Sequence, residues 1–221
     1  MKTQTVDNQK LRVAATADSQ METNSYLVAD EGSGDSVVID ANLEPQAMVE
    51  LAAEWGCIPK AILLTHTDFD HIAGLPHLRA AWGEIPIAVH PAEAWVLATG
   101  RSLRKEAPLD RPSPQLEGTE LLISGEIYRA GSLALEVLFT PGHSPGGVSL
   151  KLGQWIFTGD ALFSRGIGRS DFANSDSDAL RRGIVEQLLI QLDECVVFPG
   201  HGPSSTIGRE RTSNPFLLQI L

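Results

Sequence analysis

The stretch Thr65-His66-Thr67-Asp68-Phe69-Asp70-His71 decides how the rest of the chain is interpreted. It places four side chains that can bind metal within six positions, between the apolar residues 61–64 and the turn-like residues 72–74. A buried strand that ends in clustered imidazoles and carboxylates leaves polar groups at a sheet edge, where burial is costly unless they are paired or bound to a cation. Metal coordination is the usual way to satisfy such a set. The stretch therefore predicts a metal site at the end of a strand.

Three later segments repeat this arrangement. Thr-Pro-Gly-His at 140–143, Phe-Thr-Gly-Asp at 157–160 and Phe-Pro-Gly-His at 198–201 each place one His or Asp just beyond an apolar run. A rigid sheet holds such short projecting groups in register, so we expect them to meet at one edge. The two histidines outside the pattern, His77 and His90, are expected to be structural. The candidate ligands are His66, Asp70, His71, His143, Asp160 and His201.

Composition narrows the class of protein. The chain has 221 residues, 43 % of them hydrophobic, and a formal net charge of -11. This suits one globular domain over residues 1–221. The negative field repels phosphate backbones and anionic lipid, so we expect neither a nucleic acid nor a membrane partner. The polar N-terminus and the lack of a long apolar run favour a cytoplasmic enzyme, and nothing in the sequence indicates an oligomeric state.

The apolar and turn-forming residues predict alternating strands and helices, which favours a layered α/β architecture. Residues 99–119, rich in Pro and Gly, are expected to form a loop over the sheet. Helices are expected at 44–55, 75–82, 91–98 and 176–192. Strands are expected at 25–29, 36–40, 61–64, 85–90, 121–123, 133–139, 147–152, 155–158 and 196–198.

Taken in order, these motifs resemble the metallo-β-lactamase superfamily, and within it the glyoxalase II-like hydrolases. The family pattern is Thr-His-x-His-x-Asp-His, then a His after Pro-Gly, an Asp after Gly, and a last His. Here the first motif has Asp68 where the family has its middle histidine. The resemblance runs from about residue 24 to 216. It rests on residues 65–71, 140–147, 158–163, 166–171, 199–203 and 207–216.

The resemblance implies a four-layer αββα sandwich with two divalent metal ions at one edge. Zinc is the first expectation, with iron or manganese as alternatives. The water or hydroxide between the metals would be the nucleophile, because paired cations lower the pKa of a shared water. Asp70 would also be catalytic, by orienting that nucleophile. The implied ligand sets are His66, Asp68 and His143 for one metal, Asp70, His71 and His201 for the other, and Asp160 as a bridge.

Asp68 leaves three alternatives open. It can still ligate, which would add an anion to the first site and favour harder metals than zinc. The first site can instead be weak or lost. Finally, Asp68 can lie behind the ligands, leaving His66, His143 and Asp160 as a two-His, one-carboxylate triad for mononuclear Fe(II). That last arrangement resembles the persulfide dioxygenases of the superfamily.

The expected substrate is a small-molecule acyl compound, a thioester such as S-lactoylglutathione being what the resemblance implies. Lactones, β-lactams and phosphodiesters share the same metal chemistry. Three function classes therefore stand: a dinuclear hydrolase, a mononuclear Fe(II) persulfide dioxygenase-like enzyme, and a non-catalytic binding module. Four basic residues could hold a substrate carboxylate, although ordinary surface charges are the simpler expectation. They are Arg101, Arg104, Lys105 and Arg165.

Overall fold

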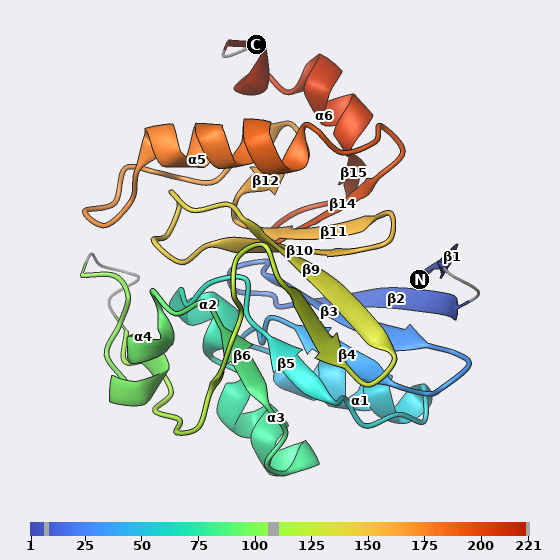
Figure 1. Cartoon of the computed structure of the whole chain (residues 1–221). Coiled ribbons are helices and arrows are strands. Elements are labelled where there is room, and N and C mark those ends of the chain that lie inside the picture. Colours follow the sequence, from blue (N-terminus) through green and yellow to red (C-terminus); the bar gives the residue numbers. More distant parts are fainter. Residues whose placement is uncertain (7–8, 106–110, 220–221) are drawn as a thin grey trace.

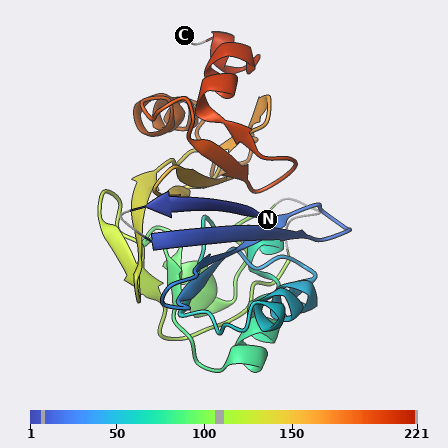
Figure 2. The ribbon, with the colours of Figure 1, turned by 90° about the vertical axis from the view of Figure 1, so that its right-hand side faces the viewer.

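A computed structural model describes residues 1–6, 9–105 and 111–219. Two β-sheets pack face to face, and helices cover the outer face of each (Figure 1). Figure 2 shows the same layers from the side, with the C-terminal helices at one extreme and α1 and α3 at the other. The arrangement is the αββα sandwich that the sequence predicts.

The first sheet has seven strands in chain order, β1 to β7. Its first four strands are antiparallel, whereas β4 to β7 are parallel, as strands joined by crossover helices must be. The strands are β1 (Lys2–Val6), β2 (Gln9–Ala17), β3 (Asn24–Asp30), β4 (Ser36–Ile39), β5 (Ala61–Leu63), β6 (Ile87–Val89) and β7 (Glu120–Leu121).

The second sheet has six strands in the order β15-β14-β11-β10-β9-β8, and the pair β11 and β14 is parallel. A small hairpin of β12 (Leu162–Phe163) and β13 (Gly166–Ile167) follows β11. The six strands are β8 (Ile127–Ala130), β9 (Leu133–Phe139), β10 (Val148–Leu152), β11 (Trp155–Gly159), β14 (Val196–Pro199) and β15 (Ser205–Thr206).

Three apolar cores separate the four layers. The central core lies between the sheets, and its members include Leu63 and Phe157. The second lies under α1, α3 and α4, and the third under α5 and α6. The helices are α1 (Pro45–Glu54), α2 (Phe69–Ile72), α3 (Leu75–Trp82), α4 (Ala94–Thr99), α5 (Ser177–Gly183), α6 (Ile207–Ser213), the π-helical η1 (Ile184–Leu188) and the 3-10 turn η2 (Leu217–Gln219).

The strand ends place the predicted motifs at one edge. The first motif follows β5 in the first sheet, and Asp160 and His201 follow the parallel strands β11 and β14 in the second. His143 lies in the turn between β9 and β10. Val148 N donates to Thr65 O (2.9 Å), which joins the two sheets beside this edge. The site is therefore built from both sheets.

Most predicted elements are present with shifted ends, and some were missed. The helix expected at 176–192 begins after the cap residue Asp176, is α-helical only to Gly183 and then widens into η1. The N-terminal strands β1 and β2 were not expected. Part of the predicted loop at 99–119 lies outside the described residues. Within the described part of the chain, no helix is long and apolar enough to span a membrane.

Candidate metal centre

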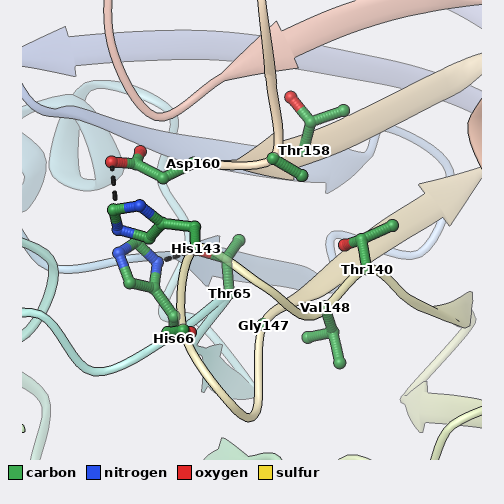
Figure 3. Close-up of a pocket in the computed structure, with 10 residues that line it drawn as sticks. Thr65, His66, Thr140, His143, Gly147, Val148, Thr158 and Asp160 are labelled. Carbon is green, nitrogen blue, oxygen red and sulfur yellow. Dashed lines mark hydrogen bonds and ion pairs between the residues drawn. The ribbon is translucent and has the colours of Figure 1, made fainter. Parts of the chain in front are cut away.

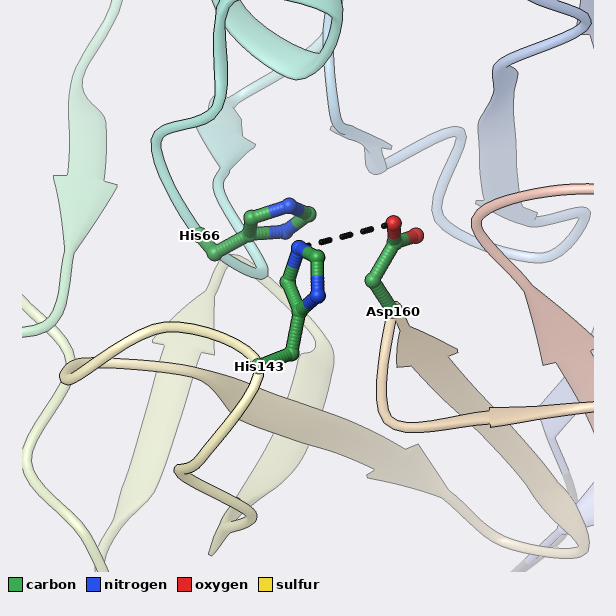
Figure 4. Close-up of side chains that lie close together, drawn as sticks. All are labelled: His66, His143 and Asp160. Carbon is green, nitrogen blue, oxygen red and sulfur yellow. Dashed lines mark ion pairs between the residues drawn. The ribbon is translucent and has the colours of Figure 1, made fainter. Parts of the chain in front are cut away.

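Two groups of possible metal ligands lie side by side at the shared edge of the sheets. His66, His143 and Asp160 form one group, and Asp70, His71 and His201 form the other. Within each group the ligand atoms all lie within 4.8 Å of one another. Figure 4 shows the first group, with both imidazoles turned toward the carboxylate. The structure thus brings together the six candidates that the sequence singled out by strand-end placement.

Asp160 lies between the two groups. Its Oδ1 is 3.4 Å from His71 Nε2, and its Oδ2 is 3.6 Å from His143 Nε2 and 3.5 Å from His201 Nε2. Burial opposes ionisation of Asp160, but the neighbouring histidines outweigh it and hold the pKa of this carboxyl well below its usual range. An ionised carboxylate in this position could bridge two cations.

All four candidate histidines use Nδ1 in a hydrogen bond and turn Nε2 toward the centre of the site, where His143 Nε2 also contacts Asp68 and Arg104. Carbonyl and carboxylate oxygens only accept hydrogen bonds, so an Nδ1 that faces such an oxygen must carry the proton. Thr65 Oγ1 donates to Asp40 (2.8 Å), so it too acts as acceptor toward His66. The partners of Nδ1 are Thr65 Oγ1 for His66 (3.1 Å), Asp40 Oδ2 for His71 (2.9 Å), the Arg169 carbonyl for His143 (2.7 Å) and the Met21 carbonyl for His201 (3.1 Å).

The donor set fits divalent cations. His66 Nε2, His71 Nε2 and Asp160 Oδ1 are buried and have no hydrogen-bond partner among the described residues. Buried polar atoms are rarely left without a partner, and these three all point into the ligand groups. Imidazole nitrogens and carboxylate oxygens are the ligands that zinc, iron and manganese share. A pair of cations would satisfy all three atoms.

The second group carries strongly shifted proton affinities. Burial raises the pKa of Asp70, but His71, His201 and a hydrogen bond from Thr23 Oγ1 (2.7 Å) bring it down to about 2. Burial lowers the pKa of His201, but Asp160 and Asp70 outweigh this and raise it to about 10. Asp70 is therefore a carboxylate at neutral pH, and a metal would compete with a proton at His201.

Asp68 lies beside the first group and is paired with an arginine. Its Oδ2 is 2.9 Å from His143 Nε2 and 3.6 Å from His66 Nε2. Arg104 Nε and Nη2 donate to the two oxygens of Asp68 at 2.6 and 2.7 Å. The expectation that Arg104 is a surface charge is wrong, because its side chain is only 1 % exposed. Arg101, Lys105 and Arg165 are exposed, as expected.

Two buried carboxylates that sequence reasoning missed support the ligand loops. Asp40 accepts from Thr65 N (2.8 Å) as well as from His71. Glu93 accepts from Thr67 N, Thr67 Oγ1 and Gly146 N at 2.6 to 2.7 Å, and so ties the first motif to the turn that carries His143. A signal for Asp40 existed, since it is an acidic residue directly after the strand that neighbours β5.

A small cavity lies behind the first group (Figure 3). His66, His143 and Asp160 stand at one end, and Thr140, Thr158 and Val148 lie toward the other. Its volume of about 10 Å³ leaves space for roughly one water molecule. The cavity is therefore too small for a substrate, and the open side of the site is the side of His201, whose side chain is 28 % exposed.

The sequence matches the metallo-beta-lactamase superfamily over residues 19–201. The probable metallo-hydrolase YqgX of Bacillus subtilis is 36 % identical over 201 residues, which cover 89 % of this chain and 93 % of that protein. The hydroxyacylglutathione hydrolase GloC of Haemophilus influenzae is 30 % identical over 196 residues, covering 88 % of this chain and 92 % of that protein.

Solved structures agree with this similarity. The B3 metallo-beta-lactamase BLEG-1 superposes with a TM-score of 0.86 at 30 % identity, covering 93 % of this chain and 99 % of that chain. TTHA1623, solved in a di-iron-bound form, gives 0.80 at 34 % identity, covering 92 % and 100 %. ETHE1 from Myxococcus xanthus gives 0.76 at 28 % identity, covering 94 % and 85 %. Fold, ligand geometry and sequence thus agree: this chain belongs to the metallo-β-lactamase superfamily.

Proposed function

We propose that the chain is a dinuclear metallohydrolase that cleaves an acyl bond of a small molecule, with a thioester as the preferred substrate. The observation that carries the proposal is the position of Asp160 between two complete ligand groups. A mononuclear enzyme has no need of the second group, in which His71 Nε2 is buried without a partner among the described residues. Two sites therefore account for the side chains better than one.

In this proposal the first metal would be bound by His66, Asp68 and His143. The second metal would be bound by Asp70, His71 and His201, and both metals would share Asp160. Two bound divalent ions would lower the pKa of a water and polarise the substrate carbonyl. The protein contributes the orientation of each ligand, because every Nδ1 has a fixed acceptor. The sandwich keeps these atoms in place while the substrate binds at the open side.

Asp70 is the proposed catalytic carboxylate. Its low pKa keeps Oδ1 and Oδ2 unprotonated at neutral pH, so it can accept a hydrogen bond from the attacking water and aim the water lone pair at the acyl carbon. Thr23 Oγ1 donates to Oδ2 (2.7 Å) and holds the carboxylate in position. Breaking the bond to sulfur needs little help from an acid, since thiolates are good leaving groups at neutral pH.

The thioester preference is supported by GloC, which is a hydroxyacylglutathione hydrolase. The name of BLEG-1 supports a β-lactam as the main competing substrate. Both substrates present a carbonyl to the same kind of centre, and the loops at the mouth decide between them. We further propose that neither a nucleic acid nor a lipid surface is a partner, since the chain carries a net charge of -11.

The test is metal analysis combined with turnover of defined substrates. The purified chain should hold about two metal ions, identified by plasma mass spectrometry, and should hydrolyse S-lactoylglutathione faster than nitrocefin without consuming oxygen. His201→Ala should lower kcat/KM by more than about 100-fold. Mutation of residues that merely orient a metal ligand already lowers metal affinity or activity by roughly 10–100-fold, and His201 is a candidate ligand itself. His77→Ala is the matched control, since the His77 side chain is exposed and, among the described residues, bonds to Gln46 and to no candidate ligand.

Three outcomes would overturn the proposal. One iron per chain, together with oxygen consumption when a persulfide is the substrate, would place the enzyme among the dioxygenases. Two metals with turnover of nitrocefin alone would assign it to β-lactams. Two metals without turnover of any acyl substrate would indicate a binding module.

A further inference from the structure

Arg104 is a buried cation whose three guanidinium nitrogens all donate hydrogen bonds beside the first ligand group. Besides the two bonds to Asp68, its Nη1 donates to Asn174 Oδ1 (2.8 Å) and its Nη2 to the His143 carbonyl (3.1 Å). The guanidinium lies over the Phe172 ring at 4.2 Å. An arginine built in this way has no freedom to reach for a substrate. Its hydrogen bonds go to Asp68, to the His143 carbonyl, and to the side chains of Asn174 and Ser175.

The pairing determines how Asp68 faces the first ligand group. Oδ1 accepts from Arg104 Nε, whereas Oδ2 accepts from Arg104 Nη2 (2.7 Å) and also lies between the Nε2 atoms of His143 (2.9 Å) and His66 (3.6 Å). Oδ2 therefore occupies the place where a third ligand of a metal held by those two imidazoles belongs. A bidentate guanidinium fixes a carboxylate in plane better than any single donor, so this orientation is rigid.

The charges also balance. The family pattern has a neutral imidazole at this position, whereas Asp68 adds a second negative charge close to His143, which already lies 3.6 Å from the Asp160 carboxylate. Arg104 brings the compensating positive charge, with Nη2 3.1 Å from His143 Nε2. The pair as a whole is neutral, and it presents one oxygen where the family presents one nitrogen.

We propose that Asp68 and Arg104 act as one unit that replaces the missing histidine at the first metal. Asp68 supplies the ligand atom, and Arg104 is a positioning residue that aims Asp68 and cancels its charge. This inference rests on the proposed dinuclear site and deepens it. It predicts that neither residue can be exchanged for the family's arrangement without the other.

A double-mutant cycle tests the coupling. The variants are D68H, R104M and D68H/R104M, with Arg12→Met as the control. Arg12 also stacks on an aromatic ring, Trp55 at 4.1 Å, and donates to a carbonyl, but it touches no candidate ligand. The readouts are zinc per chain after loading and dialysis, zinc affinity by chelator competition, and the Tm of the metal-free protein.

D68H leaves an unpaired cation 3.1 Å from His143 Nε2, so zinc should fall from about two toward one per chain, with affinity at the first site about tenfold or more weaker. D68H/R104M removes that cation and should recover the zinc content and bring the affinity to within about threefold of the natural chain. R104M leaves the buried Asp68 carboxylate without its paired cation, so the Tm of metal-free R104M should fall well below that of metal-free R12M. Zinc binding should restore part of this loss of Tm.

Additive effects in the double variant, or a D68H variant that keeps its zinc, would overturn the inference. If R104M and R12M had the same metal-free Tm, the inference would fail as well. These outcomes concern metal binding and stability, so they are separate from the proposed reaction. A coupled cycle in a chain that hydrolyses no acyl substrate would sink the proposed function and leave this unit standing.

Discussion

Asp40 Oδ2 lies 2.9 Å from His71 Nδ1, and both residues are buried. Asp40 also accepts from the backbone N and the Oγ1 of Thr65, both at 2.8 Å. One carboxylate therefore fixes the orientation of a candidate ligand in α2 and the start of the loop that carries His66. Its φ of 59° is a left-handed conformation that Asp and Asn adopt more readily than other residues with a Cβ.

Asp40→Asn should weaken metal binding while the chain still folds. Asn tolerates the left-handed backbone, but its amide has one acceptor oxygen, so His71 or Thr65 loses a partner. We expect zinc affinity to fall roughly 10–100-fold, as is typical for residues that orient a ligand. Chelator competition measures this. Asp30→Asn is the control, since the bonds of buried Asp30 to the described residues all lie within its own hairpin or go to Ser132 and Gln9. An equal loss of affinity in that variant would contradict the assignment.

Glu93→Gln should loosen the first ligand group more than the second. Glu93 is fully buried and accepts three hydrogen bonds, two from Thr67 and one from Gly146 N. A glutamine has one acceptor oxygen, so at least one buried N–H loses its partner, which costs roughly 1–3 kcal/mol of unfolding free energy. Thr67 lies between His66 and Asp68, so zinc at the first site should be lost before zinc at the second. Denaturant unfolding with metal analysis measures both effects, and preferential loss from the second site would contradict this role.

The candidate ligands could be predicted from the sequence because each follows an apolar strand. His66, Asp160 and His201 lie one to three residues after β5, β11 and β14, and parallel strands bring such positions to one edge. The strand β2 was also detectable, since the buried Leu11 and Val13 alternate with the polar Lys10 and Arg12 in a period of two. The helix at 176–192 was overestimated because apolar spacing does not distinguish an α-helix from the π-helical turn that follows Gly183.

Arg104 could not be placed in this way. It belongs to a Pro-rich segment with no periodicity, 36 residues after Asp68, and nothing local shows that its side chain turns inward. The only signal was indirect. An additional carboxylate in a buried ligand set needs a compensating cation, and a basic residue in the loop over the site is the nearest source. Charge balance would therefore have favoured a buried arginine, without indicating which of the loop cations it is.

Gly200→Ala should disrupt the shared carboxylate by steric overlap alone. A Cβ at Gly200 would overlap Asp160 Oδ1 and lie 2.8 Å from His71 Cε1. Both metals depend on Asp160 in the proposed site, so zinc affinity should fall at both by about tenfold or more. Gly166→Ala is the matched control, because its Cβ would lie 3.6 Å from Phe163, at ordinary contact distance. Chelator competition on both variants tests this, and zinc binding by G200A equal to that of G166A would contradict it.

Zinc binding should release protons, and zinc affinity should rise with pH. Burial lowers the pKa of His201 but Asp160 and Asp70 raise it to about 10 in the metal-free protein. A raised histidine pKa stabilises the metal-free fold fully below the unfolded value of about 6.5, and this contribution is lost as pH rises through about 10. Zinc binds the unprotonated Nε2 of His201, so at pH values between about 6.5 and 10 zinc binding displaces a proton from this histidine. Calorimetric titrations at pH 7 in two buffers of different ionisation enthalpy should give about one proton or more per chain. On binding zinc, H201A should release fewer protons than the natural chain, and H77A should release as many. Identical heats in the two buffers would contradict this prediction, because they would mean that the candidate histidines are already neutral before zinc binds.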